Sequence, residues 1–505
     1  MCIDKQLSKT AKYKKHFYKI YVLRKVAGLY FVLTQNSQLT TYNLQLTMKL
    51  SEKFAKVAES KAFDIKHRQT INFNMNKYDI AVEAGLKQYQ NHELARSRAS
   101  YIKTQTIAHL DEFLLEFEDK FTKNGGKIIW ADTTKTAIEA IDAIFKLNEV
   151  KSIVKSKSMT TEEIHFNDWA KEQGLENVET DLGEYIVQLA GQKPYHIVTP
   201  AMHMSKKDIA ELFVEKLHIP LTDDAQELTL TARRLLREKY TTADIGITGG
   251  NFMVADIGAV AITENEGNAR LCTTFPKIHI AIIGIEKVIP TLSQLDLFWS
   301  LLSTSGTGQK ITVYNTLYTG ARHENETDGP NEMYVILLDN GRTNLLAKPD
   351  KRQALNCIRC GACLNACPVY KNIGGHTYDT TYSGPIGSVI TPHLSGMKEY
   401  KHLSFASSLC GACTSVCPVK IDIHNLLLMN RRESVEEGYD DSLERLGFKF
   451  WKNGMKSRRM MDLVGAGLKN KLLIQLFKNS WGKKRDNLKT SQKSFNELWK
   501  ERNKS

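Results

Sequence analysis

The sequence has no apolar run long enough to cross a bilayer. The longest apolar stretch near the N-terminus, residues 20–33, is interrupted by Arg24 and Lys25. It is shorter than the roughly 20 residues that a membrane-spanning helix requires. It also lacks a small-residue cleavage site, so we do not expect a signal peptide. With 42% hydrophobic and 25% charged residues, the composition is typical of a soluble globular protein.

The motifs of several enzyme classes are missing as well. The chain has no Walker sequence and no flavin or nicotinamide fingerprint. No spacing indicates a Ser-His-Asp arrangement, and no histidine pattern is typical of a metal site. We interpret His203 and His279 as structural histidines. The chain is therefore not expected to be a complete dehydrogenase by itself.

Cysteine is scarce except in one segment. Only Cys2 and Cys272 of the nine cysteines lie outside residues 357–417. That segment contains a C-x2-C-x2-C-x3-C-P run ending at Pro368 and a C-x2-C-x3-C-P run ending at Pro418. The first run has the spacing of bacterial two-cluster ferredoxins, in which the fourth cysteine binds the other cluster. Thiols kept reduced for metal indicate the cytosol.

The crossing rule assigns the seven cysteines to two iron–sulfur clusters. The first cluster has four ligands: Cys357, Cys360, Cys363 and Cys417. The second has three, Cys367, Cys410 and Cys413, and the position of the missing ligand is Ser407. Structural zinc and disulfides are alternatives, but zinc ribbons and reducing conditions do not favour this pattern. Three alternatives stay open for the second cluster. It is a three-iron cluster, a cubane with a non-cysteine ligand such as Ser407, or a cubane with an open iron.

The positive charge lies at the two ends of the chain. The net charge is +13, and residues 1–47 carry eight Lys and Arg against one acidic residue, while residues 431–505 carry nineteen against ten. A basic end can contact nucleic acid, an anionic membrane or an acidic partner. We favour the interpretation that the basic ends are solvated surface. The sequence contains no nucleic-acid-binding motif, so nucleic acid is not an expected partner. Peripheral contact with a membrane stays open.

The hydrophobic pattern alternates between helix and strand from about residue 100. Helices are predicted at 104–121, 134–147, 161–173, 206–217, 226–240 and 292–302. Strands are predicted at 126–131, 152–155, 178–182, 196–199, 243–247, 252–256, 258–263, 278–283, 311–314 and 333–338. Strands separated by helices indicate right-handed crossovers and a mostly parallel α/β sheet.

We expect five regions along the chain. They are a basic extension outside the fold (1–47, with Met48 as the true start), a helical lead-in (48–100), an α/β domain (101–345), an α-helical two-cluster ferredoxin-type domain (346–430) and a basic region of amphipathic helices (431–505).

Three loops of the α/β domain are richer in Gly, Asn, Asp and Glu than folding requires. Residues 246–251 could hold an anion on backbone amides. Residues 264–270 could position a ligand or supply an acid and a base, although a hydrogen-bonded hairpin turn explains them equally well. Residues 180–185 follow a predicted strand, at the edge where open parallel sheets bind ligands.

Several motifs in order resemble the lactate utilization protein B family. They are KSM before Glu162 and Glu163, ETDLGEYIVQL (179–189), HIVTPAMH (196–203), GITGGNF (246–252), ITENEGNARL (262–271), CIRCGACLNACPVY (357–370) and LCGACTSVCPVKI (409–421). The resemblance covers about residues 50–500. It implies a bacterial cytosolic protein with a lactate-utilization (LUD) domain, similar in fold to ribose-5-phosphate isomerases and CoA-transferases, fused to a module with two [4Fe-4S] clusters.

The resemblance also implies a function and partners. Family members are thought to oxidise L-lactate to pyruvate with an iron–sulfur protein that has paired Cys-Cys-Gly motifs and a small LUD-domain protein, and this subunit is assigned electron transfer. The alternative is an enzyme of the transferase type, or a protein that binds an anionic metabolite. Its chemistry would lie near residues 264–270, with structural or sensing clusters.

Overall fold

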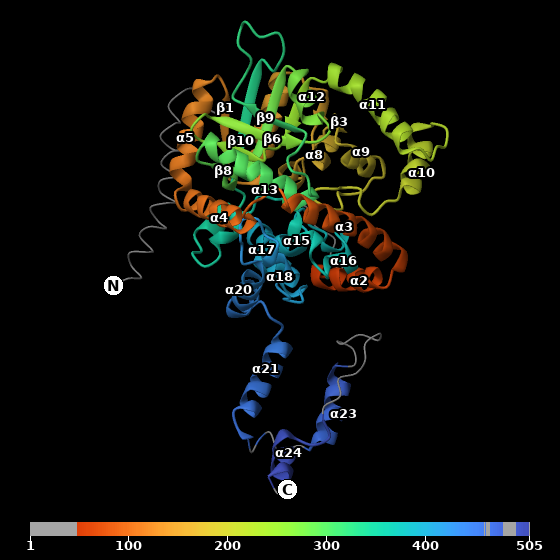
Figure 1. Cartoon of the computed structure of the whole chain (residues 1–505), viewed down its shortest axis with the longest axis vertical. Coiled ribbons are helices and arrows are strands. Elements are labelled where there is room, and N and C mark those ends of the chain that lie inside the picture. The colour runs from red at the N-terminus through yellow and green to blue at the C-terminus, as the bar shows by residue number, and fades with distance from the viewer. Residues whose placement is uncertain (1–47, 459, 461–464, 478–490, 504–505) are drawn as a thin grey trace, which may run out of the picture. The chain divides into compact units, whose positions relative to one another are not determined.

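The computed structural model describes residues 48–458, 460, 465–477 and 491–503 (Figure 1). The expectation about residues 1–47 lies outside the described residues. The chain forms two compact units, of which one ends at Glu433 and the other starts at Ser434. No helix in the described ranges has the length and apolarity to span a membrane.

A six-stranded sheet forms the centre of the α/β region. Its strand order is β1-β10-β7-β4-β2-β3, and every neighbouring pair is parallel. The strands are β1 (Lys127–Ala131), β2 (Ser152–Lys155), β3 (Glu176–Glu179), β4 (Ile245–Thr248), β7 (Ile278–Gly284) and β10 (Glu332–Leu338). The predicted parallel α/β sheet is thereby confirmed.

The closely spaced strands build a second sheet of order β8-β5-β6-β9. β6 is antiparallel to both β5 and β9, whereas β5 and β8 are parallel. The bounds are β5 (Phe252–Val254), β6 (Ala259–Glu264), β8 (Val288–Ile289) and β9 (Tyr314–Tyr318).

The helices of the first unit come in three groups. Before β1 lie α2 (Leu50–Ala62), α3 (Ile65–Leu86), α4 (His92–Ala108) and α5 (Leu110–Lys123). The α/β region contains α6 (Thr134–Leu147), α7 (Met159–Glu163), α8 (Phe166–Glu172), α9 (Leu182–Leu189), α10 (Lys206–Leu217), α11 (Ala225–Thr242), α12 (Asn268–Thr274), η1 (Ile285–Lys287), η2 (Leu292–Gln294), α13 (Leu295–Thr307) and α14 (Arg342–Leu346). The cysteine segment contains η3 (Arg352–Asn356), α15 (Ala362–Asn365), α16 (Tyr370–Ile373), η4 (His376–Tyr378), α17 (Gly384–Ser395), α18 (Met397–Phe405), α19 (Ala412–Ser415) and α20 (Ile423–Glu436).

Alternation along the central strand β7 places its side chains in two cores. Ile280 and Ile282 pack with residues of α6 and α8, whereas Ala281 and Ile283 pack with the second sheet, α5 and α13. Side chains of a strand point alternately to its two faces. The six-stranded sheet is therefore buried on both sides, as its nearly continuous apolar strands predict.

The cysteine segment packs directly on the rest of the first unit. α16 contacts α2 and α3, and η3 contacts α4. The helical lead-in thus supports the cysteine loops (Figure 1). The second unit contains α21 (Ser442–Met455), α23 (Ala466–Phe477) and α24 (Phe495–Arg502). The helical character predicted for the C-terminal region is confirmed.

Some predicted elements were wrong for local reasons. Residues 196–199 form no strand, because the His196 ring Nδ1 accepts the backbone N–H groups of Val198 and Thr199 and so bends the chain. The strand expected at 178–182 ends at Glu179, since Asp181 caps α9. The helix expected at 161–173 is divided into α7 and α8 at His165, which has a φ of 55°. The strand expected at 311–314 lies at 314–318.

Candidate metal centre

The two CGAC sequences form loops with the same backbone conformation. Arg359 and Gly361 have φ values of 63° and 83°, and Leu409 and Gly411 have values of 55° and 80°. Each glycine is followed at once by a one-turn helix, α15 or α19, and these two helices contact each other. Left-handed φ at two alternate residues wraps each loop around a small volume, which is what a cluster requires of its cysteine loop.

The cysteines are brought together in two groups. Burial raises the pKa of Cys363, and the nearby sulfurs of Cys357, Cys360 and Cys417 raise it further.

In the other group, burial and then the sulfurs of Cys367 and Cys410 raise the pKa of Cys413 to about 11. None of the described cysteines is in a disulfide. Each group contains the cysteines that the crossed assignment gives to one cluster. The assignment of these cysteines as ligands stays a prediction.

Backbone amides donate to the sulfurs. The N–H of Arg359 lies 3.4 Å from Cys357 Sγ, and the N–H of Ile421 lies 3.3 Å from Cys417 Sγ. An amide that points at sulfur stabilises the thiolate, and such hydrogen bonds tune iron–sulfur sites. Thiols without disulfide partners, converging with amide donors, fit iron–sulfur clusters.

Ser407 stands where the missing cysteine would be. Its Oγ accepts a hydrogen bond at 3.1 Å from the N–H of Leu409, two residues later. In the other loop, Cys357 Sγ accepts a hydrogen bond in the same way from the N–H of Arg359, two residues after it. The equivalence of the two loops therefore extends to this side chain. A serine oxygen therefore accepts in the second loop the hydrogen bond that a cysteine sulfur accepts in the first.

The two groups differ in exposure. Cys363 and Cys417 of the first group are 8% and 6% exposed. In the second group Cys410 is exposed, and the backbone N–H of Ala412 lowers its pKa. Val416, also on the second loop, is 39% exposed. Cys410 therefore opens the second group to the surface, whereas the cysteines of the first group are buried or, at Cys357, half-buried.

A buried chain of ion pairs leads away from the first group. Arg359 donates to Glu286 Oε1 at 3.2 Å, and Arg342 donates to Glu286 Oε2 at 2.5 Å. Arg342 also binds both carboxylate oxygens of Glu163 at 2.8 Å, and Tyr382 donates to Glu163 Oε2 at 2.6 Å. This network joins the cysteine loop to the α/β sheet.

Sequence reasoning missed this network. The signal that could have revealed the network is Arg359, a large charged residue in a C-x2-C gap. Although burial disfavours its charge, Arg342 and Arg359 lower the pKa of Glu286 to about 2. The network is therefore fully charged at neutral pH.

The network ends at a cavity of about 750 Å³. The cavity is lined by Glu163 and Tyr382, and also by Glu162, Glu179 and Glu184. It lies at the carboxyl end of β3, where residues 180–185 were predicted to mark a ligand site. Both the α/β region and the cysteine segment contribute to its walls.

The other two polar loops have packing roles. A Cβ on Gly246 would lie 1.7 Å from the carbonyl O of Cys272, and one on Gly250 would lie 2.5 Å from Ile283 Cδ1. The glycines of residues 246–251 are therefore explained by close packing. The Glu264 carboxylate accepts the N–H groups of Ala269 and Arg270 and so caps α12, and residues 264–270 do not line the cavity.

His203 and His279 occupy structural positions. His279 is buried, with Nε2 2.8 Å from Thr248 Oγ1, and the His203 ring stacks on Tyr195 at 4.7 Å. In each ring Nε2 has a hydrogen-bond partner, Thr248 for His279 and Gln192 for His203, whereas Nδ1 is buried without one among the described residues.

Comparison with known proteins agrees with this architecture. Residues 114–338 match the LUD domain family, and residues 353–421 match the 4Fe-4S dicluster domain family. Lactate utilization protein B of Shouchella clausii is 42% identical over 82% of this chain and 87% of its own length. The chain belongs to the lactate utilization protein B family. The protein of that name from Anoxybacillus flavithermus is 45% identical over 74% of this chain and 79% of its own length.

Membership in the lactate utilization protein B family confirms the resemblance found in the motifs. The chain carries a LUD domain followed by an iron–sulfur domain. A solved DUF162 family protein from Deinococcus radiodurans covers 45% of this chain and 98% of its own, with 13% identity and a TM-score of 0.24. That likeness is too weak to carry an argument.

Proposed function

We propose that this chain is an electron-carrying subunit of a cytosolic system that oxidises L-lactate to pyruvate. The names of its relatives support the link to lactate, and the iron–sulfur domain supports electron transfer. The proposed companions are an iron–sulfur protein with paired Cys-Cys-Gly motifs and a small LUD-domain protein. No flavin or nicotinamide fingerprint is present in the sequence, so a companion would supply the first oxidation step.

The proposed ligands follow the two groups of sulfurs. Cys357, Cys360, Cys363 and Cys417 would hold one [4Fe-4S] cluster, and Cys367, Cys410 and Cys413 would hold the second with Ser407 as a fourth ligand. Two clusters, each taking one electron, would together accept the two electrons that lactate releases. The backbone amides of the loops stabilise the thiolate charge.

The observation that carries the proposal is the different exposure of two groups in one module. The more buried group contacts the α/β domain through Arg359 and Glu286, whereas Cys410 of the other group reaches the surface. A carrier needs an exposed end, because electron transfer to a partner requires close approach of the two centres. The exposed Val416 gives that end an apolar surface.

The test is anaerobic purification of the full chain, with iron and sulfide analysis and low-temperature EPR before and after dithionite. About eight irons and the signals of two interacting reduced cubanes are expected. About seven irons with an oxidised three-iron signal would exclude Ser407 as a ligand. Bound zinc with no redox signal would overturn the electron-transfer proposal.

The rival function is binding or transfer of an anionic metabolite in the α/β domain. The chemistry of this rival was expected near Glu264, but residues 264–270 do not line the cavity. The cavity itself is acidic, since Glu162, Glu163, Glu179 and Glu184 line it, and such walls repel a free anion. A carrier should be reduced and reoxidised without substrate, whereas the rival should bind an anion after cluster removal.

A further inference from the structure

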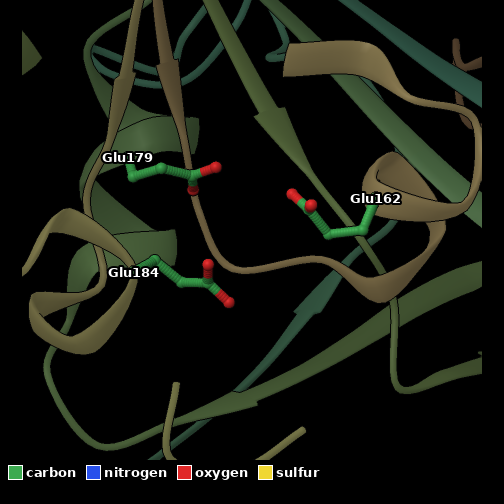
Figure 2. Close-up of side chains that lie close together, drawn as sticks. All are labelled: Glu162, Glu179 and Glu184. Carbon is green, nitrogen blue, oxygen red and sulfur yellow. The ribbon is translucent and has the colours of Figure 1, made fainter. Parts of the chain in front are cut away.

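Three glutamates of the α/β domain converge on one point of the cavity wall. Glu162 lies on α7, Glu179 ends β3, and Glu184 lies in the first turn of α9. One carboxylate oxygen from each lies within 4.8 Å of the others, and Figure 2 shows the three side chains pointing toward a common space. They meet because the chain leaves parallel strands β2 and β3 at the same sheet edge.

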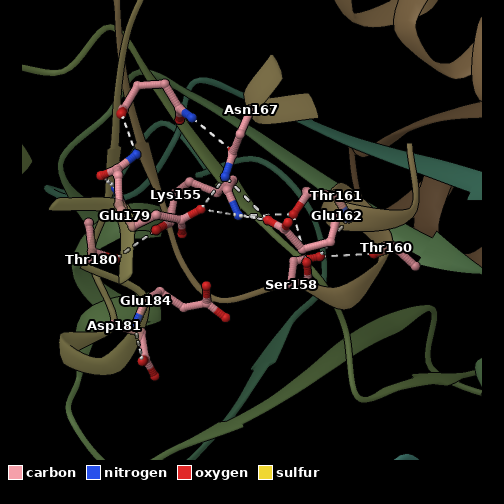
Figure 3. Close-up of polar contacts among 12 residues, drawn as sticks. Lys155, Ser158, Thr160, Thr161, Glu162, Asn167, Glu179, Thr180, Asp181 and Glu184 are labelled. Carbon is pink, nitrogen blue, oxygen red and sulfur yellow. Dashed lines mark hydrogen bonds and ion pairs between the residues drawn. The ribbon is translucent and has the colours of Figure 1, made fainter. Parts of the chain in front are cut away.

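Hydrogen-bond donors reach this group from one side. Lys155 Nζ lies 2.7 Å from Glu179 Oε1 and 3.6 Å from Glu162 Oε1. Asn167 Nδ2 donates to the same two oxygens at 2.8 and 3.2 Å (Figure 3). Glu179 Oε2 is buried and has no hydrogen-bond partner among the described residues. The remaining carboxylate oxygens are thus left facing the common space.

The Glu184 carboxylate accepts no hydrogen bond from the described residues, although Lys155 and Lys157 lie near enough to act on its charge. The residue is 2% exposed, and the hydrogen bond between its N–H and Asp181 Oδ1 involves its backbone and leaves the carboxylate free. Its side chain points toward Glu162 and Glu179 (Figure 2). A buried carboxylate without a partner is costly. Burial, followed by the charge of Glu179, raises the pKa of Glu184 well above its ordinary value.

The neighbouring cations do not balance the three carboxylates. Although burial opposes its charge, Glu179 and Glu162 raise the pKa of Lys155, which therefore stays an ammonium. The other nearby ammonium, on Lys157, donates to the carbonyl O of Val198 at 2.6 Å. One directly paired cation faces three acids, so the three carboxylates, when all are ionised, exceed the positive charge beside them.

The ligand chemistry defines what would complete the group. The converging atoms are all carboxylate oxygens, which Mg²⁺, Mn²⁺ and Ca²⁺ prefer and which softer metals do not. Oxygens on opposite sides of a magnesium ion lie about 4.2 Å apart, and those on adjacent positions lie closer. The observed spacing of up to 4.8 Å therefore accommodates an ion of this class after small side-chain movements.

We propose that Glu162, Glu179 and Glu184 bind a hard divalent cation, Mg²⁺ or Mn²⁺, in the wall of the 750 Å³ cavity. The site uses none of the seven clustered cysteines. It is therefore independent of the electron-carrier function. The cavity gives the ion access from solvent and leaves room for water or another oxygen ligand on its open side.

The test is a titration of the full, cluster-containing chain with MnCl₂ after removal of divalent ions by chelating resin. Room-temperature EPR of free Mn²⁺ measures binding. We expect one site that Mg²⁺ displaces, and Glu184→Gln should weaken it by roughly tenfold or more. Glu172→Gln, at an exposed glutamate at the end of α8, is the matched control and should bind as the wild type does.

Thermal unfolding separates loss of the site from loss of the fold. Mn²⁺ should raise the Tm of the wild type and of Glu172→Gln, because a ligand that binds only the folded state stabilises it. Without metal, Glu184→Gln should melt above the wild type, since it removes a buried carboxyl group whose ionised form is disfavoured by burial and by Glu179, and Mn²⁺ should not shift the Tm of this variant. The proposal is overturned by equal Mn²⁺ binding in Glu184→Gln and the wild type, or by no binding to the wild type at millimolar Mn²⁺.

Discussion

Replacing Arg342 by methionine should strongly destabilise the first unit. The Arg342 side chain is 1% exposed and binds Glu163 through two hydrogen bonds and Glu286 through one. After the change, Glu163 keeps Asn340 and Tyr382, and Glu286 keeps Arg359. Removing one partner of a buried ion pair costs about 3–5 kcal/mol, because the other charge is left uncompensated. Screening by solvent is small at this burial.

The loss should depend on pH in a defined direction. In the wild type the pKa of Glu286 is about 2, so its stabilising effect is complete above the unfolded pKa of 4.5 and is lost as the pH falls toward 2. In Arg342→Met the cation that lowers both carboxyl pKa values is gone, and burial raises them. Protonation then relieves the buried charge, so the difference between variant and wild type should narrow from pH 7 to pH 5.

Urea unfolding followed by far-UV circular dichroism at pH 7 and pH 5 measures both effects. Arg322→Met, at an exposed arginine of the loop before β10, is the matched control and should change stability by less than about 0.5 kcal/mol. The double variant Arg342→Met with Glu163→Gln should be less destabilised than the single variant. A loss below about 1 kcal/mol, or a loss equal at both pH values, would refute the reasoning.

Three further changes test other parts of the structure. Ser407→Cys should keep about eight irons per chain, whereas Ser407→Ala should lower the content to about seven; equal iron and EPR signals in both would show that this side chain is no ligand. Gly246→Ala should cost about 1–3 kcal/mol in urea unfolding, since its Cβ would meet the carbonyl O of Cys272 at 1.7 Å. Gly447→Ala, where an added Cβ would meet no described atom within 4 Å beyond its chain neighbours and the backbone of its own helix, is its control and should not destabilise α21. Burial lowers the pKa of His279 to about 3. Between pH 6.5 and pH 3 this histidine is therefore protonated in the unfolded chain and neutral in the folded one, so the free energy of unfolding should fall as the pH drops through this range. His279→Gln should remove about 1.4 kcal/mol per pH unit of that slope, and an unchanged slope would contradict the assignment.

Local sequence patterns were reliable where the signal and its cause lie in the same segment. The predicted helix at 134–147 and strand at 152–155 have the observed bounds, because amphipathic period and capping residues are local properties. The pattern failed at residues 196–199, where one histidine ring captures two amides. Hydrophobic alternation carries no information about such a side chain.

The sequence by itself determined the family, the parallel α/β class and the cysteines available for clusters, since motif spacing and strand order along the chain are sufficient for these. Only the tertiary structure decided that Cys410 reaches the surface while the other clustered cysteines are buried or half-buried, because exposure depends on distant elements that cover each loop. It also decided that Arg359 meets Glu286 and that Glu162, Glu179 and Glu184 converge. Crossovers bring such residues together at one sheet edge, and no local pattern encodes how a crossover packs.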